Sequence, residues 1–387
     1  MFRVALKLGL TSFGGPIAHL GYYNRTYVRE HRWLNEAEYG GLVSLCQLLP
    51  GPTSSQVGFL VGVQRAGWLG GLAAWVGFTF PSAVLMYFFA RVAPNPGPHM
   101  QALLHGLMLT ALVIVAQAVW SMLQSLAPDW PRRIIAAAAC LLLLFVHQGL
   151  AQGLTSIGGA IAGLVFCRSP PRATPGSRVR PNTRIAWMAL GLFVLLLAGL
   201  SVSVLFQGHR LLALANIFFR SGAFVFGGGH VVLPLLQQAL VPTGWLSDDR
   251  FLAGYGFAQA MPGPLFTFAA YLGAACAPLH SSWLWALVAL IAIFLPGLLL
   301  AVAGQSLLGR LGNHPHLNAV LGGINAAVVG VLAAALCNPV FVSAVHSILD
   351  ALIALGAFML LQRFKTPPIL ITLLCVTASL GNSFTGN

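Results

Sequence analysis

Two basic residues stand at matching places in apolar sequence. Lys7 lies six residues before Phe13, and Arg220 lies six residues before Phe226. A lysine or arginine at the centre of a membrane span costs at least ~2.5–3.5 kcal/mol and usually faces a cavity or a partner. Because the chain has only seven carboxylates, we expect both cations to be buried, with a ligand anion as their counter-ion. For Lys7, extension of the side chain to the cytoplasmic interface is an equally good interpretation.

Glycine- and proline-rich motifs follow each cation. Phe13-Gly14-Gly15-Pro16 returns as Phe226-Gly227-Gly228, ahead of Gly229 and His230, and Pro50-Gly51-Pro52 returns as Pro262-Gly263-Pro264. Glycine and proline weaken a helix, so these motifs are predicted to interrupt it and to begin second half-helices. A half-helix N-terminus carries free N–H groups and a partial positive charge, which suits an anion. One such motif is typical of a simple kink, but both motifs in both halves favour a substrate site.

Neutral polar residues accompany the second motif in each half. Gln47 and Gln259 precede the two Pro-Gly-Pro turns by three residues, and Ser55 aligns with Thr267. We expect these four side chains to offer hydrogen bonds to the same anion.

Other polar residues near the motifs have two interpretations each. His19 and His230 lie beside the breaks and are expected either to donate to the anion or titrate, or to have a packing or interfacial role. Arg25, Arg29 and Arg32 either shape an outer vestibule or indicate that the first segment dips into the membrane and returns.

One carboxylate is a candidate proton carrier. Asp350 follows His346 by one expected helical turn. In the alignment of the two repeats Asp350 corresponds to Arg133, near the start of a helix. An interfacial role is the favoured interpretation of Asp350.

The composition is that of a membrane protein. Apolar residues make up 58% of the 387, mean hydropathy is +0.83, and charged residues are 7%, against roughly a quarter in soluble domains. Many stretches approach the ~20 residues that a helix needs to cross a bilayer. We therefore predict an all-α polytopic protein with thirteen spans, at about 2–22, 38–63, 67–92, 101–126, 133–149, 151–167, 185–206, 210–240, 251–277, 283–306, 318–337, 341–361 and 368–384.

The duplication divides the chain into four parts. Residues 1–167 form a first membrane repeat, and residues 168–184, with five arginines and four prolines, form a cytoplasmic linker. Residues 185–206 form one extra helix, which turns the second repeat, 207–387, upside down relative to the first. An inverted repeat of this kind, with interrupted helices at matching positions, is typical of transporters. Lys and Arg are more frequent on one side of the spans, which predicts a cytoplasmic N-terminus.

Several function classes are disfavoured. The six cysteines are scattered singly, and the net charge of +13 is dispersed at helix ends, so neither a metal site, a cofactor nor nucleic-acid binding is expected. The motifs of zinc peptidases and serine hydrolases are missing from the sequence, which argues against an enzyme. A channel or a purely structural membrane protein remains an alternative, and a homodimer is left open.

The motifs resemble those of the chromate transporter (CHR) family. The resemblance rests on the Phe-Gly-Gly and Pro-Gly-Pro segments of both halves, together with His19, Trp33, Gln56, Gly58 and Trp245. It implies a bidomain protein of the bacterial inner membrane that exports chromate and gives chromate resistance, with some relatives linked to sulfate. The family's basic residues would correspond to Lys7, Arg25 and Arg220.

The expected activity is therefore export of a tetrahedral oxyanion by alternating access. Chromate and sulfate share shape and charge, so the sequence does not separate them. Proton-coupled uptake of sulfate or another oxyanion, and an anion channel, remain the alternatives.

Overall fold

The computed structural model of the chain describes residues 1–13, 15–92, 98–145, 150–167, 183–203, 209–226, 229–311, 315–364 and 366–385, and every regular element in these ranges is a helix. Gly14, Gly227 and Gly228 lie outside the described residues, as does most of the predicted linker 168–184.

Five described helical segments are long and apolar enough to cross a membrane: Thr53–Val92, Gln101–Leu126, Thr183–Val202, Ser282–Gln305 and Ala319–Ala344. Shorter apolar helices cover Ile157–Phe166, Leu265–Ala275 and Pro368–Gly381. The prediction of an all-α polytopic membrane protein is confirmed, while the number of thirteen spans stays a prediction.

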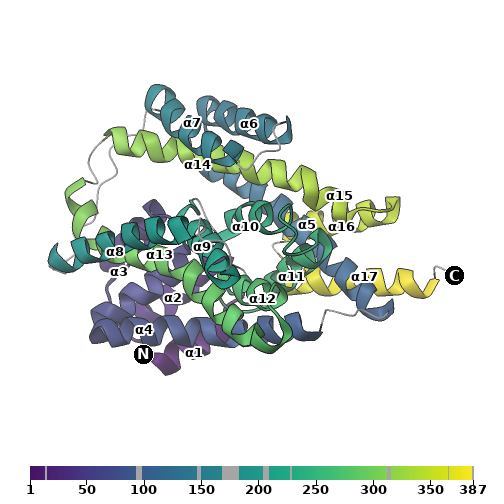
Figure 1. Cartoon of the computed structure of the whole chain (residues 1–387), viewed down its shortest axis with the longest axis horizontal. Helices are drawn as coiled ribbons and strands as arrows, with labels where there is room; N and C mark the ends of the chain where they lie inside the picture. The colour runs from purple at the N-terminus through teal and green to yellow at the C-terminus, as the bar shows by residue number, and fades with distance from the viewer. Residues whose placement is uncertain are drawn as a thin grey trace. The chain divides into compact units, whose positions relative to one another are not determined.

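The chain forms two compact units, and each takes segments from both halves of the sequence (Figure 1). Unit 1 comprises Met1–Tyr87, Pro170–Val232 and Pro262–Leu317, and unit 2 comprises Phe88–Ser169, Leu233–Met261 and Asn318–Asn387. The units therefore do not follow the boundaries of the predicted repeats.

Unit 1 contains all four of the repeated glycine and proline motifs. Its elements are α1 (Phe2–Thr11), α2 (Gly15–Tyr23), the π-helix η1 (Asn24–Glu30), α3 (Glu36–Leu48), most of α4 (Thr53–Val92), α8 (Thr183–Ser203), α9 (Arg210–Ala223), η2 (Gly229–Val231), η3 (Leu265–Thr267), α12 (Phe268–Ala275), η4 (Leu279–Ser281) and α13 (Ser282–Leu311).

The predicted breaks are present. The expected span 2–22 is interrupted after Thr11, where Ser12 has extended backbone (φ −89°, ψ 97°). The expected span 38–63 is interrupted between α3 and α4. In the second half, α9 ends at Ala223 and α11 (Asp248–Ala260) ends before the second Pro-Gly-Pro turn. Glycine and proline thus end these helices where local propensity predicts it.

The long helix α4 is a hairpin of two helices. Ala66 (φ −145°) and Gly67 (φ +65°) have non-helical backbone, and the chain reverses there. The two arms pack closely because Gly62 lies directly against the Gly70 carbonyl, where a β-carbon would overlap. This reversal falls between the expected spans 38–63 and 67–92, whose bounds stay a prediction.

The second half repeats this packing. Gly273 of α12 lies against the Trp285 carbonyl of α13, as Gly62 lies against Gly70. Farther along the same long helices, Gly9 of α1 contacts the Phe78 carbonyl, and Gly222 of α9 contacts the Ile293 carbonyl. The sequence repeat aligns the second set of contacts, because Gly9 matches Gly222 at an offset of 213 and Phe78 matches Ile293 at an offset of 215. The similarity of the two halves therefore extends to backbone packing at this contact.

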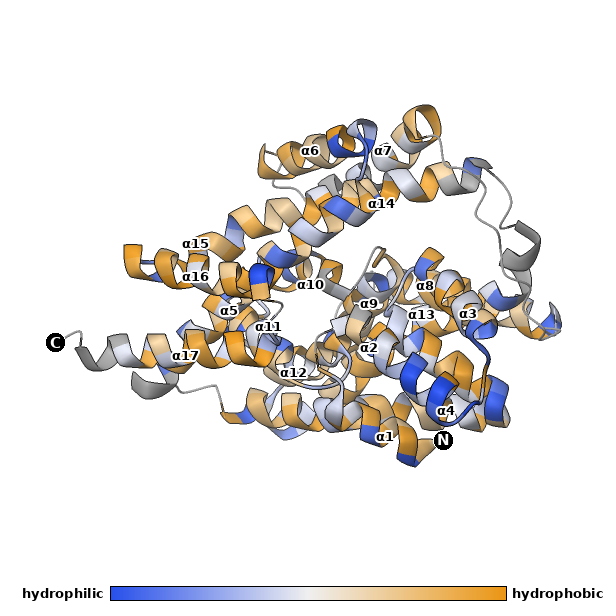
Figure 2. Cartoon of the chain, turned by 180° about the vertical axis from the view of Figure 1, so that it is seen from behind, coloured by the Kyte–Doolittle hydropathy of each residue, from blue (hydrophilic) through white to orange (hydrophobic). Residues whose placement is uncertain are grey.

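The helix α8 covers the predicted extra span. Only 11% of its most apolar window is buried within the protein, and most of its residues are apolar (Figure 2). Such a helix, apolar on its outer face, is suited to lipid.

Unit 2 is built around α5. Its elements are α5 (Pro98–Leu126), α6 (Trp130–Phe145), α7 (Leu150–Phe166), α10 (Val232–Leu240), α11, most of α14 (Pro315–Ala335), the π-helix η5 (Leu336–Phe341), α15 (Val342–Ala344), α16 (Ile348–Phe364) and α17 (Pro368–Thr385). The helix α5 packs against α11, α16 and α17, and Gly106 of α5 lies against the backbone of Val376.

The expected span 341–361 is wrong at its start. The helix α16 begins only at Ile348, after a non-helical segment from Val345 to Ser347. Ser347 caps it, because the Ser347 Oγ accepts from the Asp350 N–H (3.1 Å) while the Asp350 Oδ2 accepts from the Ser347 N–H (2.9 Å). This capping box fixes the start of the helix at Ile348, whereas hydropathy alone predicts a helix that begins earlier. His346 therefore lies outside the helix that carries Asp350.

Candidate functional site

Two backbone hydrogen bonds join the interrupted segments of the two halves. The Gly51 N–H of the first Pro-Gly-Pro turn donates to the Val225 carbonyl (2.8 Å), just before Phe226. The Gly263 N–H of the second turn donates to the Ser12 carbonyl (2.9 Å), just before Phe13. The two bonds are reciprocal: each Pro-Gly-Pro turn holds the residue that precedes the Phe-Gly-Gly motif of the other half.

The first break is also held by a buried histidine. The His19 Nε2 lies 3.2 Å from the Ser12 carbonyl oxygen, and Nδ1 lies 3.4 Å from the Ser54 Oγ. The imidazole packs edge-on against Phe78 at 5.2 Å. Because both ring nitrogens have partners in the protein, the geometry favours the positioning role of His19 over direct contact with an anion.

The Pro-Gly-Pro turns lead directly into helices, as predicted. Pro52 immediately precedes α4, and Pro264 immediately precedes η3. The Gln56 Nε2 braces the first turn by donating to the carbonyls of Pro50 (2.8 Å) and Gly297 (2.9 Å). In the second turn, the Thr267 Oγ1 donates to the Pro264 carbonyl (2.8 Å).

The central residue of each turn has to be glycine. Gly51 has φ +116° and Gly263 has φ +96°, a region that side chains rarely adopt. A β-carbon on Gly51 would lie 2.8 Å from the Gly297 Cα, and one on Gly263 would lie 2.8 Å from the Ser82 Oγ. Both turns thus combine a strained backbone with close packing.

Polar atoms without a partner are buried beside the breaks. The hydroxyls of Ser12 and Ser55 are buried, and neither makes a hydrogen bond among the residues that the structure describes. The same holds for the Thr79 hydroxyl and for the Gln56 Oε1. Burial of an unpaired hydroxyl costs about 1–3 kcal/mol, so these groups are available to a ligand or to water.

The two cations lie differently from the sequence prediction. The side chains of Lys7 on α1 and Arg220 on α9 are exposed, so the prediction that each is buried in the protein is wrong. The physical reason is that α1 and α9 are short and amphipathic, with the small residues of one face packed against the long helices. A cation cannot face hydrocarbon cheaply, so each exposed side chain is suited to an aqueous vestibule or an interface.

The arginines of the predicted vestibule are largely ion-paired. The Arg25 Nε donates to the Glu30 carboxylate (2.8 Å), and the Arg29 Nε lies 3.8 Å from the Glu36 carboxylate. Arg29 and Arg32 line a shallow pocket of about 690 Å³ beside Trp33. Because Glu36 and Glu38 also line this pocket, their negative charges reduce the positive electrostatic potential that would attract an anion.

The remaining predicted site residues are divided between the two units. Gln47 is exposed near the end of α3 in unit 1, whereas Gln259 belongs to unit 2 and is hydrogen-bonded to Tyr255. Phe13 and Phe226 are half-buried at the two breaks, and Pro262 is half-buried in its turn. The structure describes Gly15 at the start of α2, but it does not describe the side chains of Pro16 and His230.

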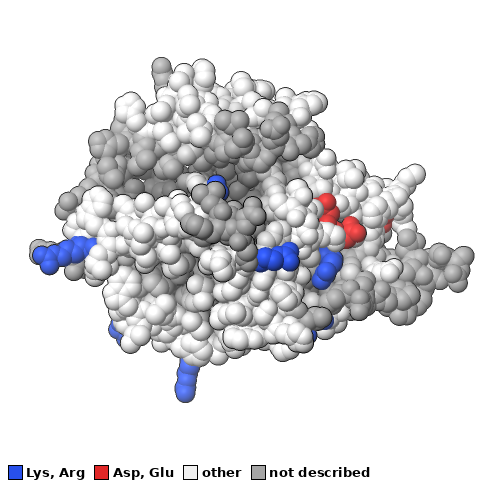
Figure 3. All heavy atoms as spheres, viewed as in Figure 1, with Lys and Arg blue, Asp and Glu red and all other residues white. Residues whose placement is uncertain are grey.

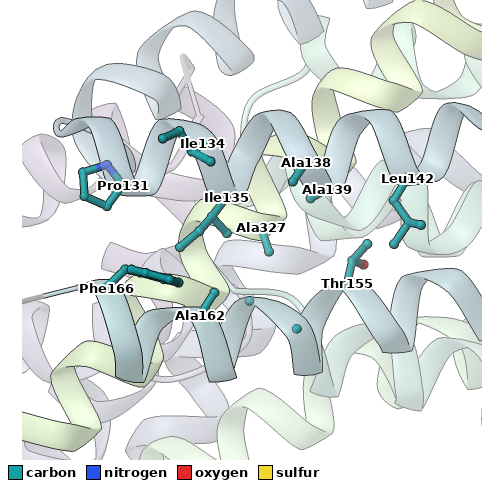
Figure 4. Close-up of a pocket in the computed structure, with 12 residues that line it drawn as sticks. Pro131, Ile134, Ile135, Ala138, Ala139, Leu142, Thr155, Ala162, Phe166 and Ala327 are labelled. Atoms are coloured by element: carbon teal, nitrogen blue, oxygen red, sulfur yellow. The ribbon is translucent and has the colours of Figure 1, made fainter.

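A cavity of about 600 Å³ in unit 2 does not suit an oxyanion (Figure 4). Its walls are side chains of α6 and α7, such as Ile135, Leu142 and Phe166, with Ala327 of α14 behind them. Thr155 supplies the one hydroxyl of its lining. An apolar cavity offers nothing that would replace the hydration of a dianion.

The surface charge is also sparse. On the face shown in Figure 3, single basic side chains project from a mostly uncharged surface, with few acidic ones. The dispersed distribution of basic residues predicted from the sequence is consistent with this view.

Together, the apolar helices and the paired interrupted segments define a polytopic membrane protein of the transporter class. The sequence model of the Chromate transporter family matches residues 1–166 and 212–380. The chain therefore belongs to the chromate transporter family.

Three curated relatives illustrate the similarity. The chain is 30% identical over 368 residues to a chromate transport protein of Cupriavidus metallidurans, covering 93% of this chain and 86% of the relative. It is 29% identical over 337 residues to a probable chromate transport protein of Synechococcus elongatus (85% and 81%). It is 26% identical over 359 residues to a chromate transport protein of Pseudomonas aeruginosa (86% and 79%). No solved structure matches the chain.

Sequence reasoning missed two polar residues of the breaks. Ser12 accepts from both His19 and Gly263, and Gln56 bridges two carbonyls. The position of Ser12 directly before Phe13 was the available signal for its role. Gln56 belongs to the family-like motif, but its partner Gly297 is 241 residues away. The sequence around Gln56 therefore does not indicate this contact.

Proposed function

We propose that the protein exports chromate across the bacterial inner membrane by alternating access, with the oxyanion bound at the interrupted segments of unit 1. The observation that carries this proposal is the pair of reciprocal hydrogen bonds, Gly51 to Val225 and Gly263 to Ser12. These bonds bring together the helix ends at which a membrane protein best receives an anion.

Reciprocal contacts are what two copies related by a two-fold axis produce, because residue i then contacts j while j contacts i. Two stacked copies in the same orientation would not produce them. With the extra helix α8 between the halves, we infer that this axis lies in the membrane plane and that the repeats are inverted. Either half can then open while the other closes.

The anion would be held mainly by neutral donors. The unpaired hydroxyls of Ser12 and Ser55 lie beside the breaks, and α4 begins immediately after Pro52 with its first amides free of helical bonds. We assign the exposed Lys7 and Arg220 to the aqueous approach, where they raise the local concentration of anions. Gln47, Arg25 and the turn prolines stay secondary candidates for contact.

The membrane potential favours export. Moving a dianion out of a cell whose interior is negative releases about 2.3 kcal/mol per charge per 100 mV, or roughly 4.6 kcal/mol for both charges. An importer would have to carry at least two cations to cancel this energy. Asp350, the buried carboxylate of the described residues, is engaged in its helix cap and by His105, which disfavours it as a free proton carrier.

The test measures flux into inverted inner-membrane vesicles, whose outer face corresponds to the cytoplasm. With an inside-positive potential we expect saturable accumulation of labelled chromate that unlabelled chromate competes away. Parallel flux of labelled sulfate gives the selectivity. Proton-driven movement of chromate out of these vesicles, toward the side that corresponds to the cytoplasm, would support an importer. Ohmic single-channel currents would support a pore. Either result rejects the proposal.

The site itself is tested by two serine variants. Ser12→Ala and Ser55→Ala each remove a buried hydroxyl that has no partner among the described residues, so neither should lower thermal stability. A hydrogen bond to a charged ligand contributes about 1.5–3 kcal/mol, so each variant should weaken chromate affinity by about 10-fold or more. Ser201→Ala is the matched control, because the Ser201 hydroxyl donates within α8 to the Leu197 carbonyl. Unchanged affinity in both variants would remove these hydroxyls from the site.

A further inference from the structure

A second cluster of ligand-type side chains belongs to unit 2, whereas the interrupted segments belong to unit 1. His105 of α5, His346 of the segment before α16, and Asp350 in the first turn of α16 bring one donor atom each to within 4.8 Å of one another. We propose that these three side chains bind a divalent transition-metal ion of the Zn²⁺ class.

The donor set matches the chemistry of such an ion. Two imidazoles and one carboxylate are ligands that Zn²⁺ prefers, and three protein ligands leave a fourth position for water. The His105 Nε2 already lies 3.0 Å from the Asp350 Oδ1, and the rings of His105 and His346 stack at 5.3 Å. Two Zn²⁺ bonds of roughly 2.0–2.2 Å at the tetrahedral angle place their donor atoms about 3.4 Å apart. Donors within 4.8 Å of one another therefore need to approach by at most about 1.4 Å, and the His105–Asp350 pair has to separate slightly.

The carboxylate is oriented by neighbouring groups, as metal-bound carboxylates usually are. The Asp350 Oδ2 accepts from the backbone N–H groups of His346 (3.1 Å) and Ser347 (2.9 Å), and also from the Ser347 hydroxyl (2.9 Å). These bonds occupy Oδ2 and leave Oδ1 directed at His105. The capping box therefore presents one carboxylate oxygen to the ion.

Burial gives the cluster an access path. Asp350 is buried, His105 is half-buried, and His346 is exposed. An ion from solvent would meet His346 first and then reach the buried carboxylate. Asp350 is the buried carboxylate among the described residues, so a divalent cation would meet a negative charge there in addition to the two imidazoles.

The other half of the chain lacks this chemistry at the same crossing. Gly106 contacts Val376, and Gly323 contacts Gly159. These two contacts correspond in the repeat, because Gly106 aligns with Gly323 and Gly159 aligns with Val376 at the same offset of 217 positions. The same shift aligns His105 with Gly322, and a β-carbon on Gly322 would meet the Arg132 guanidinium at 3.5 Å. The crossing therefore packs without histidines, so the His–Asp cluster is not a requirement of the fold.

The experiment uses the full-length protein in detergent, with its affinity tag cleaved and metal removed by a chelator. Zn²⁺ is titrated in competition with a chromogenic chelator, and Co²⁺ is added separately to record its visible absorption. We expect one Zn²⁺ per chain, a rise in melting temperature with Zn²⁺, and the intense d–d bands of four-coordinate Co²⁺.

Three variants locate the site. His346→Ala and His105→Gln should weaken Zn²⁺ binding by at least about 10-fold and remove the Co²⁺ bands, while His280→Ala, an exposed histidine of unit 1, should change neither. His105→Gln keeps a donor for Asp350, and melting without metal reports its folding. Absence of Zn²⁺ binding at millimolar concentration, weak octahedral Co²⁺ bands in the unmodified protein, or full binding by His346→Ala would each overturn the proposal and leave a plain His–Asp ion pair.

Discussion

Replacement of Gly51 by alanine tests the packing of the first Pro-Gly-Pro turn. Gly51 has φ +116°, and its added β-carbon would lie 2.8 Å from the Gly297 Cα and 2.9 Å from the Gln56 Nε2. The backbone conformation costs a non-glycine residue about 1–3 kcal/mol. Overlap with backbone in a packed interior adds about 1–3 kcal/mol. We therefore expect Gly51→Ala to destabilise the protein by about 2–6 kcal/mol.

A matched control separates the two costs. Gly67 at the turn of α4 also has a positive φ (+65°), but nothing lies within 4 Å of its added β-carbon. Gly67→Ala should therefore cost only the backbone strain of about 1–3 kcal/mol. Gly297→Ala approaches the same contact from the other side, since its β-carbon would lie 3.0 Å from the Pro52 Cδ, and it does so without a positive φ.

The assay compares thermal stability in detergent with chromate flux per folded molecule in proteoliposomes. We expect Gly51→Ala to lose more stability than Gly67→Ala and to lose flux beyond the loss of folded protein, because the turn also holds the Val225 carbonyl. Gly297→Ala should impair flux with a smaller loss of stability. Equal stability and equal flux in Gly51→Ala and Gly67→Ala would refute the assignment of this turn to a tight contact between the two halves.

Three further substitutions test other parts of the site. Gln56→Leu leaves the carbonyls of Pro50 and Gly297 without their donor and should destabilise the protein by about 1–3 kcal/mol or more, measured against Gln64→Leu on the same helix; an unchanged melting temperature would contradict the clamp. Arg220→Gln should lower chromate flux most strongly at low ionic strength, since an exposed cation acts through a screened field; loss of flux that is independent of salt would instead indicate direct binding. Arg25→Gln should have a small effect, because Arg25 is exposed and paired with Glu30; abolished transport would restore it to the substrate site.

The amino-acid sequence alone determined the membrane class and the places where the helices break. Composition decides the first, because few charges leave no water-soluble surface. Glycine and proline determine the breaks through local backbone energetics. The helices α1 and α3 accordingly end just before the motifs that begin at Phe13 and Pro50. The family-like motifs identified the same segments.

Tertiary structure decided which groups meet at those breaks. The partners of Gly51 and Gln56 are Val225 and Gly297, far away along the chain, and no local propensity encodes such a pairing. The exposure of Lys7 and Arg220 depends on which face of a short helix packs against α4 or α13, and the start of α16 depends on a cap formed by Ser347. Local preferences thus specify where a helix ends, whereas long-range packing of small residues specifies what the exposed ends are bound to.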